Sequence, residues 1–182
     1  MDLHNDIEKI LISEKEIEAI VTDIAKRISE DYKDKKLLLL CILKGSVVFM
    51  GDLMKHISIP VQIDFMKVSS YSAGTTSGNL KIKLDLQRDD LDTTDILIIE
   101  DIIDSGKTLS ALTKYLAERG AKSVRSCTLL DKPSRREVEF TPDYTGREIP
   151  DEFVIGYGLD YNEDYRALPF VGILKREVYE KN

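Results

Sequence analysis

The chain has 182 residues, 42% of them hydrophobic and 32% charged, which is typical of a globular protein with its own core. Its net charge of −7 and its pI of about 5.0 argue against a general binder of nucleic acid. No apolar run approaches the roughly 20 residues of a membrane span, and no signal peptide is visible. Cys41 and Cys127 lie in separate apolar runs, so neither a disulfide nor a zinc site is predicted. We expect a single cytoplasmic domain over residues 1–182, without a membrane partner.

The first predicted elements are a helix and a strand. Ser13 and Glu16 have the S-x-x-E spacing of a capping box, and apolar residues recur at helical spacing from Ile17 to Ile28. Residues 35–43 are almost continuously apolar, which predicts a strand that is buried on both faces.

The remaining elements alternate in type along the chain. We predict a short helix from Gly45 to about His56, a strand at 61–68, a loop at 69–78, a half-buried strand at 80–86, a buried strand at 96–99, a helix from about Lys107 to Gly120, a buried strand at 124–130, and short strands at 153–157 and 171–174. This alternation predicts an α/β fold with a mainly parallel sheet flanked by helices. Ligands of such sheets bind at the carboxyl ends of the strands.

The segment IIEDIIDSGKTLS, residues 98–110, carries the most information about chemistry. A strand delivers Glu100 and Asp101 to the sheet edge, and a turn then leads into a helix. Backbone N–H groups of residues 105–108 would converge on one point at the helix N-terminus, which favours a phosphate. Carboxylates beside a phosphate are reasonable if they bind sugar hydroxyls or a divalent cation. We therefore expect a ligand that combines phosphate and sugar.

Other interpretations of this segment are weaker. Gly106, Lys107 and Thr108 match the end of a nucleotide-binding P-loop, but that pattern requires glycine where Asp101 stands. The acidic pair could simply be solvated, and Asp104 could cap the following helix.

The same segment resembles the phosphoribosyl pyrophosphate (PRPP) signature of the type I phosphoribosyltransferases. That signature has four apolar residues, an acidic pair, two apolar residues, a variable residue and then Thr-Gly-x-Thr, with Ser105 here in place of the first threonine. Further segments resemble the hypoxanthine-guanine branch of that family and extend the match over nearly the whole chain. They are Leu43-Lys44-Gly45-Ser46, Ser70-Tyr71, Asp131-Lys132, Phe153-Val154, Leu159-Asp160 and Arg166.

The resemblance implies a reaction. A 5-phosphoribosyl group would pass from PRPP to N9 of hypoxanthine or guanine, giving IMP or GMP and pyrophosphate with the help of Mg²⁺. It also implies a small hood over the site, built largely from residues 131–182 with the N-terminal segment, and a homodimer or homotetramer.

For PRPP, the resemblance assigns three groups of residues. Glu100 and Asp101 would hold the ribose hydroxyls and the metal, residues Asp104, Ser105, Gly106, Lys107 and Thr108 would hold the 5-phosphate, and Lys44, Gly45 and Arg166 would hold pyrophosphate. The resemblance also implies a non-proline cis peptide bond before or at Lys44.

For the purine, the resemblance assigns Asp104 as the general base at N7. Lys132 would donate to the carbonyl oxygen of a 6-oxopurine, Phe153 would stack on the ring, the Val154 carbonyl would accept from a guanine amino group, and Asp160 would hold a second Mg²⁺ through water. Ser70 and Tyr71 would belong to a lid that excludes water. Without the resemblance, Lys132 would be interpreted as a surface lysine and Phe153 as a core residue.

One alternative function stays open at this point. A regulator with the same fold could bind nucleotide and RNA without catalysing a reaction. The acidic pI weakens RNA binding, so we do not expect a nucleic acid partner.

Overall fold

The computed structural model describes residues 3–70 and 80–180. In chain order its elements are η1 (Leu3–Asp6), β1 (Ile7–Ile12), α1 (Glu14–Asp31), β2 (Leu37–Ile42), α2 (Val47–His56), β3 (Val61–Ser70), β4 (Leu80–Leu84), η2 (Leu91–Thr93), β5 (Asp95–Ile103), α3 (Lys107–Glu118), β6 (Ser123–Asp131), η3 (Pro133–Arg135), β7 (Tyr144–Glu148), β8 (Val154–Ile155), β9 (Val171–Leu174) and α4 (Arg176–Tyr179).

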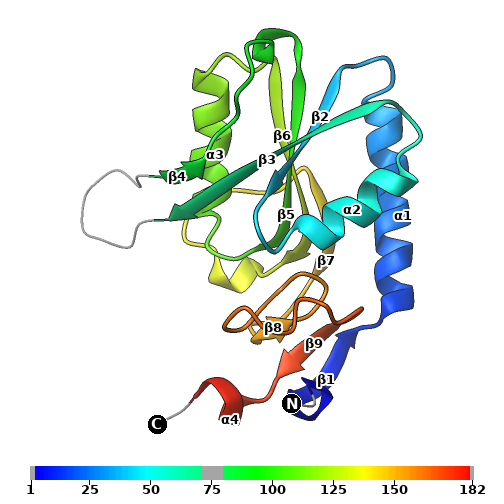
Figure 1. The fold of residues 1–182 in the computed structure, drawn as a ribbon, viewed down its shortest axis with the longest axis vertical. Helices are drawn as coiled ribbons and strands as arrows, with labels where there is room; N and C mark the ends of the chain where they lie inside the picture. The colour runs from blue at the N-terminus through cyan, green and yellow to red at the C-terminus, as the bar shows by residue number, and fades with distance from the viewer. Residues whose placement is uncertain (1–2, 71–79, 181–182) are drawn as a thin grey trace.

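A six-stranded sheet forms the centre of the molecule, with the order β4-β3-β2-β5-β6-β7. All neighbouring pairs are parallel except β3 and β4. The helices α1 and α2 lie on one side of this sheet and α3 lies on the other (Figure 1). The predicted α/β fold with a mainly parallel sheet is therefore confirmed.

The central strand β2 shows why the sheet is covered on both faces. Leu37, Leu39 and Cys41 pack in the core under α1 and α2, whereas Leu38 and Leu40 pack in the core under α3. Every residue of β2 is buried, because side chains alternate between two faces that are both apolar.

The helix α1 begins as its sequence predicts. The Ser13 hydroxyl accepts from the Glu16 backbone N–H, and the Glu16 carboxylate accepts from the Ser13 backbone N–H at 2.9 Å, which completes the capping box.

Several boundaries differ from those predicted. β5 extends to Ile103, so Glu100 and Asp101 lie within the strand rather than after it. β3 extends through Ser70, whereas the sequence predicted a loop from residue 69. β1 and β7 were not predicted, because neither IEKILI nor YTGRE has a clear apolar alternation.

A smaller antiparallel sheet with the order β1-β9-β8 lies at one end of the larger sheet, together with both ends of the chain (Figure 1). We call this sheet and the segment between β8 and β9 the hood. β7 falls within the range expected for the hood but pairs with β6 in the larger sheet. Among the described residues, no helix is long and apolar enough to cross a membrane.

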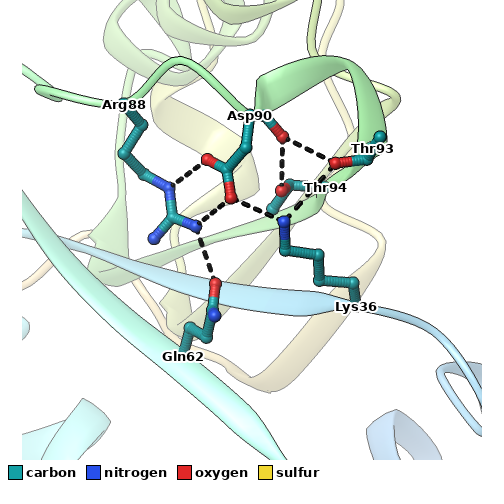
Figure 2. A network of polar contacts seen from close by, with 6 residues as sticks. All are labelled: Lys36, Gln62, Arg88, Asp90, Thr93 and Thr94. Carbon is teal, nitrogen blue, oxygen red and sulfur yellow. Dashed lines mark hydrogen bonds and ion pairs between the residues drawn. The ribbon is translucent and has the colours of Figure 1, made fainter.

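Hydrogen bonds and ion pairs connect several side chains at the amino-terminal edge of the larger sheet (Figure 2). Arg88 donates to both carboxylate oxygens of Asp90, at 2.9 and 2.8 Å, and also to Gln62 at the start of β3. Lys36, just before β2, binds the same carboxylate. Because the parallel strands begin at this edge, the network stabilises the end of the sheet that lies opposite the predicted ligand site.

Candidate active site

Two adjacent carboxylates lie near the carboxyl end of β5. The side chains of Glu100 and Asp101 are half-buried, and the backbone N–H of Ile102 donates to Asp101 Oδ1 at 2.9 Å. Burial raises the pKa of Asp101 to about 6. Burial, followed by the charge of Asp101, raises the pKa of Glu100 above its usual range. These carboxylates therefore favour a positively charged or hydrogen-bond-donating ligand, which would stabilise their ionised forms.

A small pocket of about 120 Å³ lies at the turn between β5 and α3. Gly106 is the N-cap of α3 with φ +80°, and the Ser105 hydroxyl accepts from the Lys107 backbone N–H at 3.4 Å. A side chain at Gly106 would be strained by this φ and would meet Arg136 Cδ at 2.9 Å. The residues that line the pocket include Glu100, Asp104, Ser105, Gly106 and Thr108. A helix N-terminus whose cap residue has no side chain, beside a pocket of this size, suits a phosphate.

Asp104 is exposed and does not cap α3, so the capping interpretation is wrong. Arg135 Nε instead donates to Asp104 Oδ1 at 3.3 Å, and Arg135 Nη1 lies 3.6 Å from Asp151 Oδ2. Arg136 donates to the backbone carbonyl of Asp104 and forms an ion pair with Asp131. Arg135 and Arg136, which follow β6, therefore fix the position of the turn between β5 and α3.

The peptide bond between Leu43 and Lys44 is cis, as the resemblance implies. The loop that follows packs directly against β5: a Cβ on Gly45 would lie 1.7 Å from Asp101 Oδ2. It also packs against the hood, because a Cβ on Gly158 would lie 2.0 Å from the Gly45 carbonyl oxygen. A Cβ at Gly158 would clash with backbone and a Cβ at Gly45 would displace the Asp101 carboxylate, so the loop is closely packed between β5 and the hood.

Basic and acidic side chains meet beside this loop. Arg166 donates to the Gly158 carbonyl oxygen at 2.8 Å and lies 2.9 Å from Asp160 Oδ1. The Glu163 carboxylate lies 2.9 Å from Lys44 Nζ and 3.1 Å from Arg166 Nη2. The structure thus brings together Lys44, Gly45 and Arg166, which were assigned to pyrophosphate, with Asp160, which was assigned to the metal, and with Glu163 in addition.

Lys132 lies at the end of β6, next to the turn that carries Asp104. Its backbone N–H donates to the Ile103 carbonyl oxygen at 3.0 Å. The side chain is 9% exposed, so Lys132 is not the surface lysine of the alternative interpretation. No ion-pair partner of Lys132 lies within residues 3–70 and 80–180, which leaves its ammonium group available to a ligand.

Phe153 lies directly before β8 of the hood and is 36% exposed, so it is not a core residue. Its ring stacks on Tyr179 with centroids 4.8 Å apart and meets the edge of Tyr161 at 5.6 Å. Val154 is buried in β8, opposite Ile173 of β9. The lid residue Tyr71 lies outside the described residues, and of Ser70 only its place at the end of β3 is described.

Sequence reasoning did not identify Arg135, Glu163 or Tyr179. Each contacts a predicted residue that is distant in sequence, 31 positions away for Arg135 and Asp104 and 119 for Lys44 and Glu163. No local pattern marks these two pairs, so only the fold identifies them. Glu163 also contacts Arg166, which is only three residues away in sequence.

The donor chemistry of the site fits Mg²⁺ if the substrate supplies further ligands. Within the described part of the chain, no group of three or more His, Cys, Asp or Glu side chains is arranged to hold a metal alone. Mg²⁺ is usually bound by one or two carboxylates together with substrate phosphates and water. Glu100 and Asp101 are half-buried carboxylates beside the phosphate-sized pocket and meet this requirement.

Comparison with known proteins gives consistent matches. The phosphoribosyl transferase domain family matches residues 9–162. A hypoxanthine-guanine phosphoribosyltransferase of Staphylococcus epidermidis is 49% identical over 180 residues, which cover 98% of this chain and all of the relative. The crystal structure of a hypoxanthine phosphoribosyltransferase from Staphylococcus aureus has a TM-score of 0.94 at 46% identity, covering 100% of this chain and 98% of that one. A hypoxanthine-guanine phosphoribosyltransferase from Bacillus anthracis has a TM-score of 0.86 at 40% identity, covering 93% and 98%.

Proposed function

Because the chain belongs to the phosphoribosyltransferase family, we propose that it catalyses purine salvage, transferring the 5-phosphoribosyl group of PRPP to N9 of hypoxanthine or guanine. The products are IMP or GMP and pyrophosphate. The observation that carries this proposal is the phosphate-sized pocket at the α3 N-terminus, whose wall includes the carboxylate of Glu100. A phosphorylated sugar satisfies both halves of that pocket, because its phosphate accepts from the helix N–H groups and its hydroxyls donate to a carboxylate.

PRPP would lie along the carboxyl edge of the larger sheet. Its 5-phosphate accepts hydrogen bonds from the turn at residues 104–108, including the hydroxyls of Ser105 and Thr108. Its ribose hydroxyls donate to Glu100 and Asp101. Its pyrophosphate lies at the cis-peptide loop, where Lys44, the Gly45 backbone and Arg166 provide donors.

The neighbouring positions of Asp104 and Lys132 support a 6-oxopurine. Purine N7 and the substituent at C6 lie side by side on one edge of the ring, and that substituent is an acceptor in guanine but a donor in adenine. The ammonium group of Lys132 donates to the O6 atom, and Asp104 manages the proton at N7. An adenine amino group would face the ammonium donor to donor, which disfavours that base.

The hood would complete the base site. Phe153 stacks on the purine ring, and base–aromatic stacking contributes about 1–3 kcal/mol per base. The Val154 carbonyl accepts from the guanine amino group. Ser70 and Tyr71 would belong to the lid that keeps water from the reacting sugar.

Magnesium would be held by Glu100 and Asp101, together with oxygens of PRPP, and by Asp160 through water. When bound, it neutralises the pyrophosphate leaving group. We further propose that residues 1–182 act as one domain with the hood as its base-binding part, in a cytoplasmic homodimer or homotetramer.

The experiment that tests this function is an ultraviolet assay with PRPP and Mg²⁺, in which hypoxanthine, guanine, xanthine and adenine are offered separately. Turnover of hypoxanthine or guanine, with little or none of adenine, is expected. Binding of PRPP without turnover of any base would contradict the proposal. It would favour instead a regulator that binds nucleotide and RNA, which the similarity to catalytic relatives does not favour.

A further inference from the structure

Glu163 lies at the centre of the basic groups assigned to pyrophosphate. Its carboxylate oxygen Oε2 is 2.9 Å from Lys44 Nζ and 3.1 Å from Arg166 Nη2. The hydrogen bonds from Lys44 and Arg166 hold the pKa of Glu163 below its usual value. An internal anion therefore bonds to both cationic side chains that an incoming diphosphate group would need.

The backbone at Glu163 is unusual. Tyr161 and Asp164 exchange backbone hydrogen bonds at 3.3 and 3.0 Å across a two-residue turn. Its central residues, Asn162 and Glu163, have φ values of 52° and 70°. Both positions require positive φ in such a turn, and glycine commonly takes the second one because glutamate is strained there. Strain retained at one residue is a reason to look for a role of its side chain.

We propose that Glu163 is a built-in competitor of the pyrophosphate group: its carboxylate binds Lys44 and Arg166 in the free protein and must leave them when PRPP or pyrophosphate binds. This inference rests on the proposed function and extends it. Glu163 thereby weakens the binding of both diphosphate ligands and speeds the release of pyrophosphate.

The surroundings of Glu163 support exchange rather than permanent anchoring. Its side chain is 64% exposed, so it can turn outward into solvent. Arg166 does not depend on Glu163 for its position, because it also binds the Gly158 carbonyl oxygen and Asp160. Removing the Glu163 carboxylate should therefore remove one anion from Arg166 without moving its guanidinium group.

A positioning role for Glu163 predicts the opposite change in diphosphate affinity. If Glu163 served to orient Lys44 and Arg166 for the ligand, its removal would weaken diphosphate binding. The direction of the change in affinity thus separates competition from positioning.

The test measures binding of inorganic pyrophosphate, with Mg²⁺, by titration calorimetry, together with KM for PRPP. Glu163→Gln should lower both the Kd of pyrophosphate and the KM for PRPP by about 2- to 30-fold, which is the range spanned by two exposed ion pairs. The gain should shrink at high salt, because salt screens the competing pairs. Glu118→Gln, which removes an equal charge from the exposed end of α3, is the matched control and should change neither value.

A second variant, Glu163→Gly, removes the carboxylate and also places at φ 70° the residue that tolerates it. It should tighten pyrophosphate binding as Glu163→Gln does, and it should also raise Tm. Weaker or unchanged pyrophosphate binding in both variants, in a preparation whose wild type converts hypoxanthine, would overturn the competitor role alone. A wild type that neither converts hypoxanthine nor binds pyrophosphate would overturn the proposed function and this inference with it.

Discussion

Substitution of Gly45 by alanine tests the contact between the cis-peptide loop and β5. The new Cβ would lie 1.7 Å from Asp101 Oδ2 and 2.7 Å from Asp101 Cγ, whereas ordinary contact begins at 3.4 Å. The carboxylate oxygen must therefore move by about 1.7 Å, or the loop must retreat by as much. A misplacement of about 1 Å at a reacting centre can cost 10²-fold in rate, so kcat/KM for PRPP should fall by at least about that factor.

The stability of the same variant should also fall. Overpacking costs typically about 1–3 kcal/mol, and each kcal/mol shifts Tm by about 2–4 °C in a domain of this size. Steady-state kinetics with varied PRPP and a thermal melt measure the two effects.

The matched control is Gly51→Ala, within α2 and close to the same loop in sequence. No heavy atom lies within 4 Å of the added Cβ, so the substitution should raise Tm through helix propensity and leave kinetics unchanged. Wild-type kcat/KM for PRPP in Gly45→Ala would refute the argument that the position of Asp101 matters for the reaction.

Three further variants probe the purine side of the site. Asp104→Asn should lower kcat by about 10²–10⁴, the usual size for a lost general base, while PRPP binding by calorimetry stays near wild type; a small loss of kcat would remove Asp104 from that role. Lys132→Met should lower kcat/KM for hypoxanthine by about 10- to 100-fold, the effect of a lost charged donor, without lowering Tm; unchanged kcat/KM for hypoxanthine would show that the ammonium group does not bind O6. Tyr179→Ala should raise KM for hypoxanthine by about 2- to 10-fold and leave KM for PRPP unchanged, because Phe153 loses its stacked partner. An equal rise in both KM values would instead indicate a general loss of order in the fold.

Local features of the structure could be predicted because neighbouring residues cause them. The helix after Ser13 forms its capping box within four residues, and the glycine at the start of α3 could be recognised from the adjacent sequence, although residues after β6 also contact that turn. β2 could be predicted because both faces of the sheet are covered, which makes its residues uniformly apolar.

Non-local features could not be predicted in the same way. β7 contains a glycine whose missing side chain leaves room for the Leu129 carbonyl oxygen, so it pairs through backbone fit rather than apolar alternation. The exposure of Phe153 and the burial of Lys132 reverse the usual preference of each residue type. Those reversals became expected only through the family resemblance, because propensity alone favours the opposite.

The pairing of β1 with β9 has a consequence for synthesis of the chain. β1 leaves the ribosome before every strand of the larger sheet, whereas its partner, Val171–Leu174, leaves after all of them. The strands of the larger sheet all precede residue 149, so its pairing does not have to wait for the hood. On a growing chain the phosphate turn can therefore form while β1 still has no partner. The base-binding half of the site is completed only after β9 has been synthesised.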